Sequence, residues 1–308
     1  MSKLHNVLVS AIIPTYNGRN KIITCLNGLA TQSRKPDEVI VVIDGSTDDT
    51  KEVLTKYSGF PVLKIIEKEN RGRATSRNVG ASNANGNLFI FFDDDIRASN
   101  NVIERHIEFH STHSNSLASG QILEDPTLST SDIFQFKAHL SKKWTSKYKE
   151  GINKLKLNDL FLTAANFSIR KTDFYSLGGF NEKLSDAEDF ELGFRALQSG
   201  FDIYFDKDNI AWHDDVITCK KYIARQRQYN KAHQDLAKII IDIDKGFQKR
   251  SLKINLFKRL VFSFFSHSFW VKMIDSELLT FLPKFVRYQL YDWVITGLGK
   301  VYPNNRID

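Results

Sequence analysis

The sequence predicts an α/β fold in which helices flank a mostly parallel central sheet, followed by a mainly helical C-terminal extension. In the first hundred residues, apolar runs rich in β-branched side chains alternate with segments of helical periodicity, the pattern of parallel strand–helix units. The charge then changes: residues 216–308 hold 17 Lys and Arg against 7 Asp and Glu, whereas residues 1–215 hold 26 against 29. We therefore expect a domain over 1–215, with halves 1–100 and 101–215, and an extension over 216–308.

The composition is that of a globular protein. The 308 residues are 42% hydrophobic, which is enough to build a core. Cys25 and Cys219 lie in no CxxC or CxxH spacing, which argues against a disulfide scaffold or a structural zinc site and fits a reducing compartment. The N-terminal apolar run, closed by Pro14, is too short for a signal peptide, and no later apolar run is long enough to span a bilayer. A cytoplasmic location is expected.

Strands and helices can be placed along the first half of the chain. We expect strands at 7–13, 39–43, 62–66 and 88–92, and a helix from Ile22 to about Gln32. Ser46 is predicted to cap a further helix, with Asp48 and Asp49 in the first turn, where the helix dipole favours anions. Asp44 is different, because it lies at the carboxyl end of the second strand and is expected to face a ligand.

The most informative stretch is LFIFFDDDI, residues 88–96. A run this apolar indicates a strand buried on both faces, so Asp93, Asp94 and Asp95 must emerge at its carboxyl end. In an open α/β sheet that edge binds ligands, and clustered carboxylates there suit Mg²⁺ or Mn²⁺ bridging to phosphates. A simple polar loop after a strand is the alternative.

Three arginines precede this strand, in the segment NRGRATSRNVG at 70–80. Arginines near a helix start can hold a diphosphate by bidentate contacts, and Arg73 and Arg77 are the candidates. The alternative is a solvated basic turn.

The second half of the domain carries two further patterns. Residues 101–113 are predicted to be helical, with Asn101 and Glu104 at capping-box spacing, and three histidines, His106, His110 and His113, share one face. A metal site there is one interpretation, but a solvated face is expected. Strand and helix signals follow at 117–123 and 133–148, and a last helix opens on Glu188 and Asp189, where carboxylates can be catalytic or only partners of the helix dipole.

Taken together, these segments resemble glycosyltransferase family two, the inverting, nucleotide-sugar-dependent enzymes of the GT-A fold. The resemblance covers roughly residues 9–214, and the motifs occur in family order: SAIIPTYNG, EVIVVIDGSTDDT, NRGRATSRNVG with ANGNLFIFFDDDI, AANFSIRK, GGFNE, AEDFELGFRALQSG and IAWHDD. It implies a catalytic domain over 1–215, with a nucleotide-binding half and an acceptor half.

The resemblance also implies roles for individual residues. Asp189 matches the general base, Asp44 the acid that accepts from the nucleobase, and Arg77 the arginine near uracil and phosphates. Asp93 is similar to the DxD acid near the ribose, and Asp95 and His213 to the metal ligands, for Mn²⁺ or Mg²⁺. The remaining expected substrate or nucleotide contacts are Pro14, Thr15, Tyr16, Asn17, Arg73, Asp94, Glu188 and Arg225.

The expected reaction is a single displacement at the anomeric carbon, which needs one carboxylate base and a cation that neutralises the leaving diphosphate. The donor is expected to be a nucleotide sugar, most favourably a UDP-sugar, and the acceptor a glycan or a lipid-linked glycan. The chain departs from the family pattern in two places. Ile43-Asp44 stands where a pair of acids is usual, and RQRQY at 225–229 lacks the tryptophan of the QxxRW element of processive synthases. A non-processive transferase is expected.

Three rival functions remain. A sugar nucleotidyltransferase would carry a GxGTR loop after its first strand, which PTYNG does not supply. An inactive nucleotide-sugar-binding protein would have lost its base or metal acids. A nucleic-acid binder ranks last, because the aspartate triplet would repel a phosphate backbone.

The extension beyond residue 215 mixes aromatic and basic side chains, mainly between Leu256 and Trp293. Such a mixture suits helices lying on an anionic membrane surface, peripheral to the inner face of the cell membrane. Packing on the catalytic domain, or a homodimer interface through the extension, is the alternative.

Overall fold

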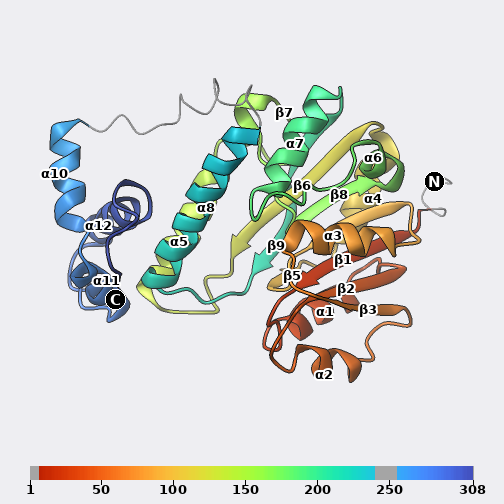
Figure 1. Ribbon diagram of the computed structural model, residues 1–308, viewed down its shortest axis with the longest axis horizontal. Coiled ribbons are helices and arrows are strands. Elements are labelled where there is room, and N and C mark those ends of the chain that lie inside the picture. The colour runs from red at the N-terminus through yellow and green to blue at the C-terminus, as the bar shows by residue number, and fades with distance from the viewer. Residues whose placement is uncertain (1–6, 240–254, 308) are drawn as a thin grey trace. The chain divides into compact units, whose positions relative to one another are not determined.

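The computed structural model describes residues 7–239 and 255–307, and the chain divides into two compact units (Figure 1). The first comprises residues up to 124 and 143–214, and the second comprises 125–142 and the chain from 215 onward. The segment 125–142, which lies within the predicted domain 1–215, is grouped with the chain from 215 onward.

The first unit contains a nine-stranded sheet and its flanking helices. The strands are β1 Val9–Thr15, β2 Glu38–Asp44, β3 Leu63–Lys68, β4 Leu88–Phe92, β5 Ile96–Ala98, β6 Ser116–Glu124, β7 Ile152–Leu155, β8 Asn166–Arg170 and β9 Asp202–His213. The helices are α1 Ile22–Ala30, α2 Thr50–Thr55, α3 Arg73–Ser82, α4 Val102–Thr112, the 3₁₀ turn η1 Leu157–Asp159, α6 Lys171–Ser176 and α7 Glu188–Gln198, and the end of α5 Asp132–Thr145 enters this unit.

The strand order is β3-β2-β1-β4-β8-β6-β9-β5, with β7 paired to β9 (Figure 1). The first four strands are parallel, whereas β8 runs antiparallel to both β4 and β6, and β5 and β7 run antiparallel to β9. Every residue of β1, β2 and β4 is buried, as expected for parallel strands covered on both faces. The predicted α/β fold class is confirmed, and the parallel strands β1 to β4 all lie within residues 1–100.

The parallel register brings the ends of β1, β2 and β4 to one edge of the sheet. Thr15 pairs with Ile43 at the end of β1, Asp44 ends β2, and Asp93 directly follows β4. The candidate residues from three separate motifs therefore lie at the same edge, where open α/β sheets bind their ligands.

The turn after β2 differs from its sequence prediction. Ser46 does not cap a helix: α2 begins only at Thr50, and the Ser46 hydroxyl accepts the N–H of Asn17 at 2.9 Å. Asp48 accepts the N–H of Thr50 at 3.1 Å, so an acid close to the helix start takes the role expected of the serine. The reason is that Asn17, in the left-handed region at φ 50°, lies against this turn and competes for the hydroxyl.

The histidines of α4 are also placed differently. His106 and His110 are buried, with exposed fractions of 1% and 4%, so the prediction of a solvated face is wrong for both. The ring of His106 hydrogen-bonds Asn166 Oδ1 and Ser168 Oγ, each at 2.8 Å, and His110 Nε2 lies 2.9 Å from the same serine hydroxyl. Asn166 and Ser168 of β8 satisfy both ring nitrogens of His106 and the Nε2 of His110, whose Nδ1 is buried without a partner in the described chain. Among the described residues no three His, Cys, Asp or Glu side chains gather into a metal site.

The second unit is helical and has a core of its own. Its elements are the first part of α5, then α8 Cys219–Ile239, α10 Leu256–Phe265, α11 Ser268–Asp275, α12 Lys284–Thr296 and the π-helical turn η3 Gly297–Val301. Asp132 anchors α5 to α12, because it accepts bonds from Arg287 Nε at 2.7 Å and from the Tyr291 hydroxyl at 2.7 Å. Over the described residues, every helix is too short or too polar to cross a bilayer.

The buried histidines predict a pH-dependent stability. Burial lowers the pKa of His106 to about 4 and that of His110 to about 3, so between pH 6.5 and these values protons bind mainly the unfolded chain and stability falls as pH falls. The free energy of unfolding in urea, measured for the wild type and for His110→Leu, should therefore differ by an amount that changes with pH. Between pH 6.5 and 5 the wild type should lose about 2 kcal/mol more than the variant. A difference that stays constant over this range would contradict the assignment.

Candidate active site

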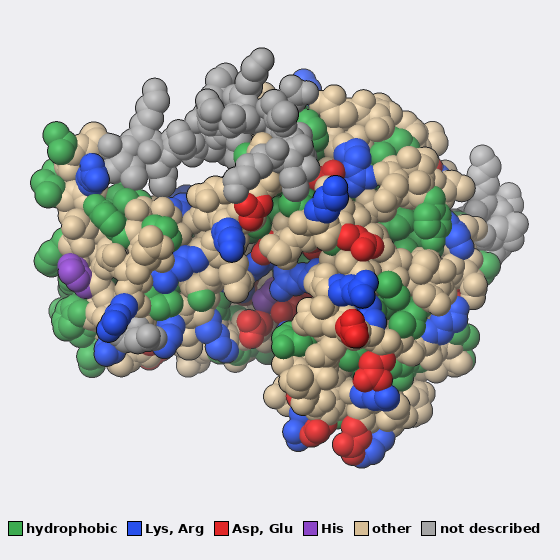
Figure 2. All heavy atoms as spheres, in the orientation of Figure 1, with side chains coloured by type: hydrophobic (Ala, Val, Ile, Leu, Met, Phe, Trp, Pro, Cys, Tyr) green, Lys and Arg blue, Asp and Glu red, His purple; other side chains and the backbone are tan. Residues whose placement is uncertain are grey.

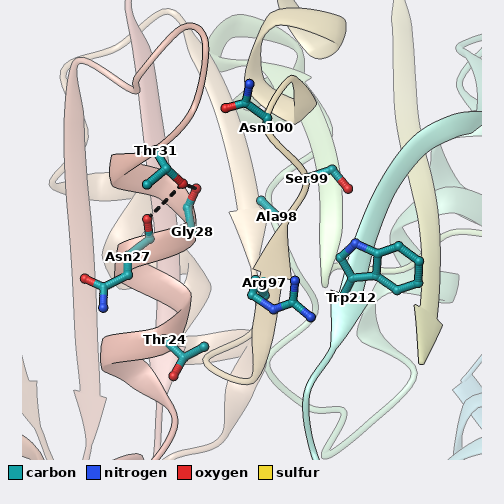
Figure 3. A pocket seen from close by; sticks show the side chains of 9 residues that line it. All are labelled: Thr24, Asn27, Gly28, Thr31, Arg97, Ala98, Ser99, Asn100 and Trp212. Carbon is teal, nitrogen blue, oxygen red and sulfur yellow. Dashed lines mark hydrogen bonds between the residues drawn. The ribbon is translucent and has the colours of Figure 1, made fainter. Parts of the chain in front are cut away.

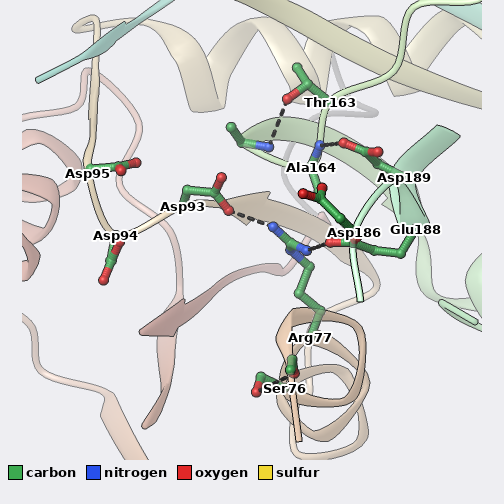
Figure 4. A network of polar contacts seen from close by, with 12 residues as sticks. Ser76, Arg77, Asp93, Asp94, Asp95, Thr163, Ala164, Asp186, Glu188 and Asp189 are labelled. Carbon is green, nitrogen blue, oxygen red and sulfur yellow. Dashed lines mark hydrogen bonds and ion pairs between the residues drawn. The ribbon is translucent and has the colours of Figure 1, made fainter. Parts of the chain in front are cut away.

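The three aspartates after β4 point in different directions and meet different partners (Figure 4). Asp93 accepts from Arg77 Nη2 at 2.5 Å. Asp94 is buried, accepts the Thr15 hydroxyl at 2.7 Å and lies 3.2 Å from Lys21 Nζ. Asp95 faces His213, with 3.6 Å between Oδ2 and Nε2. The triplet is therefore not a single cluster of equivalent ligands, and each acid has a separate role.

Arg77 is the buried cation of the site. Its side chain is 2% exposed, and it forms ion pairs with Asp93 and with Glu188 at the start of α7 (Figure 4). Burial alone would raise the pKa of Asp93, but the guanidinium beside it holds that pKa below its usual value. One side chain on α3 therefore ties the end of β4 to the start of α7.

A sharp turn before α7 gives the neighbouring side chains of Glu188 and Asp189 different partners. Ala187, in the left-handed region at φ 61°, precedes α7, and such a conformation costs a non-glycine residue about 1 kcal/mol or more. Glu188 meets Arg77, whereas Asp189 is partly exposed and accepts the N–H of Ala164 at 3.2 Å and that of Phe190 at 2.7 Å.

Asp189 has the electrostatics of a base that works near neutral pH. Partial burial, helped by the negative charge of Glu188, raises its pKa to about 7, although Arg77 and the two backbone N–H groups act in the opposite direction. A carboxylate with such a pKa can accept a proton from a hydroxyl in a single step and release it again.

The residues expected to bind a metal fit that function. Asp95 Oδ1 and His213 Nδ1 are buried and have no hydrogen-bond partner within the described chain. Their backbones are fixed, because Ile96 pairs with His213 across β5 and β9 and the Asp214 N–H donates to the Asp95 carbonyl at 3.0 Å. A carboxylate and an imidazole supply two ligands, and Mg²⁺ or Mn²⁺ typically takes the others from substrate phosphates and water.

Asp44 lies where the sequence predicts, at the end of β2, but its oxygens already have partners. The buried carboxylate accepts the N–H groups of Arg71 and Gly72, both at 2.9 Å, and pairs with the ammonium of Lys68. Gly45, at φ +68°, allows this approach, since a Cβ there would lie 2.7 Å from the backbone nitrogen of Asn70. Asp44 therefore shapes the loop that leads into α3.

The segment Pro14 to Asn17 lies beside the aspartate triplet, because the Thr15 hydroxyl donates to Asp94. Pro14 and Thr15 are buried, whereas Tyr16 is 50% exposed and Asn17 accepts the N–H of Thr47 at 2.8 Å. Gly18 keeps this segment close to the triplet, because a Cβ at that position would lie 2.0 Å from the Thr15 hydroxyl oxygen.

Sequence reasoning missed the residues that hold α3 in place. Asn78 Oδ1 accepts the N–H of Phe180, its amide nitrogen donates to the Phe180 carbonyl and to Glu182 Oε1, each at 2.9 Å, and the Thr75 hydroxyl donates to Glu182 Oε2 at 3.1 Å. The motif GGFNE is thus a clamp on the helix that carries Arg77. The available signal in the sequence was that the polar residues Thr75, Asn78 and Glu182 had no predicted role.

Two further expected contacts lie on helices, and the charge of one of them, Arg73, helps to lower the pKa of Asp93. Arg73 is exposed and is the first residue of α3, and Arg225 lies on α8 in the second unit. Lys21, which the sequence analysis did not single out, approaches both Asp94 and Asp95, at 3.2 and 3.9 Å.

Comparison with known proteins agrees with this arrangement. The family described as Glycosyl transferase family 2 matches residues 10–178, more than half of the chain. The chain belongs to glycosyltransferase family 2. It is similar to the O-antigen chain rhamnosyltransferase RfbN of Salmonella typhimurium, with 24% identity over 287 residues, 92% of this chain and 88% of RfbN. It spans 64%, 18% and 13% of the length of three other curated relatives that it matches.

Two solved structures resemble the chain along nearly its whole length. S. aureus TarS 1-349, crystallised with UDP, is 21% identical at a TM-score of 0.55, covering 96% of this chain and 91% of that one. The mannosyltransferase PcManGT from Pyrobaculum calidifontis, in complex with GDP-Man and Mn²⁺, is 15% identical at a TM-score of 0.59, covering 97% and 88%. At these identities the likeness shows the fold, which is the expected GT-A fold.

Removing the charge of Arg77 should unfold the site. Arg77→Met leaves Asp93 and Glu188 without their counter-charge, and breaking a buried ion pair in this way costs about 3–5 kcal/mol. Chemical denaturation should show that loss, while Arg73→Met, an exposed arginine of the same helix, should change stability by less than about 0.5 kcal/mol. Equal stability of the two variants would mean that Arg77 does not hold the carboxylates together.

Proposed function

We propose that this family 2 chain is a non-processive, inverting, metal-dependent glycosyltransferase that moves a sugar from a nucleotide-diphosphate donor, most favourably a UDP-sugar, to a glycan or lipid-linked acceptor. The observation that carries the proposal is the pair of neighbouring acids at the start of α7. Glu188 is neutralised by Arg77, whereas Asp189 keeps a pKa near 7. One acid positions the site, and the other is ready to take a proton.

In this mechanism the acceptor hydroxyl attacks the anomeric carbon, its proton passes to Asp189, and the bond to the diphosphate breaks. Arg77 holds Asp93 in place on the donor side through their 2.5 Å contact, and Glu188 on the acceptor side. Asp95 and His213 would hold the divalent cation, which neutralises the leaving diphosphate when it is bound. No second nucleophilic carboxylate is needed, because inversion takes one displacement.

The relatives support the donor and acceptor classes of the proposal. TarS is crystallised with UDP and PcManGT with GDP-Man and Mn²⁺, and RfbN is named as an O-antigen chain rhamnosyltransferase. We therefore place the chain in cell-surface polysaccharide or glycolipid assembly. A sugar nucleotidyltransferase and an inactive nucleotide-sugar-binding protein are the alternatives.

A donor screen tests the proposal. The full chain is incubated with UDP-, GDP- and dTDP-sugars in Mn²⁺ or Mg²⁺, and release of nucleoside diphosphate is measured. Release should stop with a chelator, and kcat/KM should fall about tenfold per pH unit below 7, since protonated Asp189 cannot accept a proton. Asp189→Asn should bind nucleotide normally and lose turnover by roughly 10² to 10⁴.

The outcomes of this screen separate the alternatives. Release of pyrophosphate from a nucleoside triphosphate and a sugar phosphate would identify a nucleotidyltransferase. Nucleotide-sugar binding without any release would identify an inactive protein. Full turnover in the presence of a chelator would contradict the proposed metal dependence. If Asp189→Asn binds nucleotide weakly but turns over normally at saturation, Asp189 is a binding residue and not the general base.

The second unit supports a proposal about where the enzyme works. Its aromatic residues separate into two groups. Tyr288 and Tyr291 pack in the core, where each contacts Phe136 edge to face, and Phe262 is also buried. Five phenylalanines instead have exposed fractions between 59% and 78%: Phe257, Phe264, Phe269, Phe281 and Phe285. Core packing thus accounts for only part of the aromatic content.

We propose that these exposed phenylalanines rest on the inner face of the cell membrane. Lys258, Arg259, Lys272 and Lys284 are exposed on the same helices, and Figure 2 shows hydrophobic and basic side chains intermixed over the second unit. Rings in the acyl boundary with cations at anionic headgroups are the pattern of an interfacial helix. Such docking would bring a lipid-linked acceptor to a cytoplasmic enzyme. A homodimer through the same surface is the alternative.

Vesicle flotation distinguishes the two. The full chain should float with phosphatidylglycerol-containing vesicles, less so at high salt because the electrostatic part is screened. The double variant Phe281→Ser, Phe285→Ser should stay in solution, whereas Trp144→Ser, which removes an exposed ring from α5, should float normally. If the wild type stays in solution with vesicles and forms a stable dimer that the double variant loses, the surface is a dimer interface.

A further inference from the structure

The first unit contains a groove that the proposed mechanism does not use. It has a volume of about 380 Å³ and lies between the outer face of α1 and the edge strand β5 with the turn that follows it (Figure 3). Thr24 and Thr31 line the helical wall, Arg97 lines the strand, and Trp212 of β9 forms the opposite wall. This volume is within the usual range for ligand pockets, about 300–1,000 Å³.

The local backbone explains why the groove is open. Gly28 brings α1 close to β5, since a Cβ there would lie 3.3 Å from the Ala98 nitrogen, so no side chain fills the floor at that point. Trp212 and Arg97 pair across β9 and β5, and their side chains lie on the same face. The next residue of β9, His213, points to the other face, toward Asp95. The groove therefore lies on one face of β5 and β9, and the proposed metal ligands Asp95 and His213 lie on the other.

The lining favours one class of ligand. A partly exposed indole offers a flat apolar surface, and the threonines and Arg97 surround it with hydrogen-bonding groups. The charge of Arg97 is compensated by Asp214, which accepts from Nε at 2.8 Å and from Nη2 at 3.2 Å, so the groove is not built for a phosphate. A sugar ring combines an apolar face with a rim of hydroxyl groups and matches this lining.

We propose that the groove is a carbohydrate-binding subsite that holds neutral sugar units of the glycan acceptor or product, away from the reacting centre. The proposal rests on the transferase function above and specifies its acceptor as a glycan. Asp214 connects the two sites, because its carboxylate holds Arg97 while its N–H donates to the Asp95 carbonyl at 3.0 Å. A glycan in the groove is thus anchored on the strands that carry the metal ligands.

Binding of an array of short neutral and uronic-acid-containing oligosaccharides to the full chain, without nucleotide, tests the proposal. The wild type should bind neutral members, and Trp212→Ala should weaken the best of them roughly tenfold or more, since truncating a buried aromatic contact removes most of its binding energy. Trp144→Ala, an exposed tryptophan elsewhere, should bind like the wild type. Thr24→Tyr, which fills the groove from an exposed helical position, should weaken binding without disturbing the core.

The outcomes distinguish this subsite from the transferase function. Unfolding midpoints identify any variant that fails to fold, and Thr24→Tyr then decides. If the wild type binds no oligosaccharide, or if both groove variants bind as well as it does, the subsite is excluded even when the donor screen is positive. If the groove variants lose binding while no nucleotide sugar is consumed, the subsite stands and the transferase function fails.

Discussion

The site depends on the buried ion pairs of Arg77. Its guanidinium joins Asp93, which follows β4, to Glu188 at the start of α7, so one cation pairs with two acids (Figure 4). Without it, Asp93, Glu188 and Asp189 would bring like charges into a desolvated space, which is strongly unfavourable. With it, the pKa of Asp93 is held below its usual value, while burial raises the pKa of Asp189 to about 7, which suits proton transfer near neutral pH.

This arrangement explains why so much of the site consists of supporting contacts. Asn78 and Glu182 fix α3, Asp44 fixes the loop before it, and the strained Ala187 fixes the start of α7. None of these residues needs to touch a substrate for the geometry to depend on them. A preorganised site requires such a second layer, because small displacements of a catalytic group are costly.

The sequence predicts the fold class and the edge where the site lies, because a buried strand such as 88–92 has an unmistakable pattern and three aspartates cannot remain inside it. It does not predict partners that come from distant elements. His106 and His110 were expected in solvent because the sequence of α4 does not indicate that Asn166 and Ser168 of β8 lie against it as hydrogen-bond partners. In the same way, the Ser46 hydroxyl accepts the N–H of Asn17, a residue 29 positions away, instead of capping a helix. Which phenylalanines of the second unit are exposed also depends on tertiary packing, which composition alone does not encode.

The segment 125–142 has a consequence for how the protein is made. It leaves the first unit between β6 and β7, and its Asp132 is held by Arg287 and Tyr291, 155 and 159 residues later in the chain. During synthesis the first unit has all its strands once β9 has emerged, but Asp132 of α5 meets these partners only when α12 has been made. Contacts so distant in sequence form slowly, and the apolar face of α5 stays open to other chains in the interval. Synthesis of α12 therefore sets the moment at which the carboxylate of Asp132 and the face of α5 beside it can be covered.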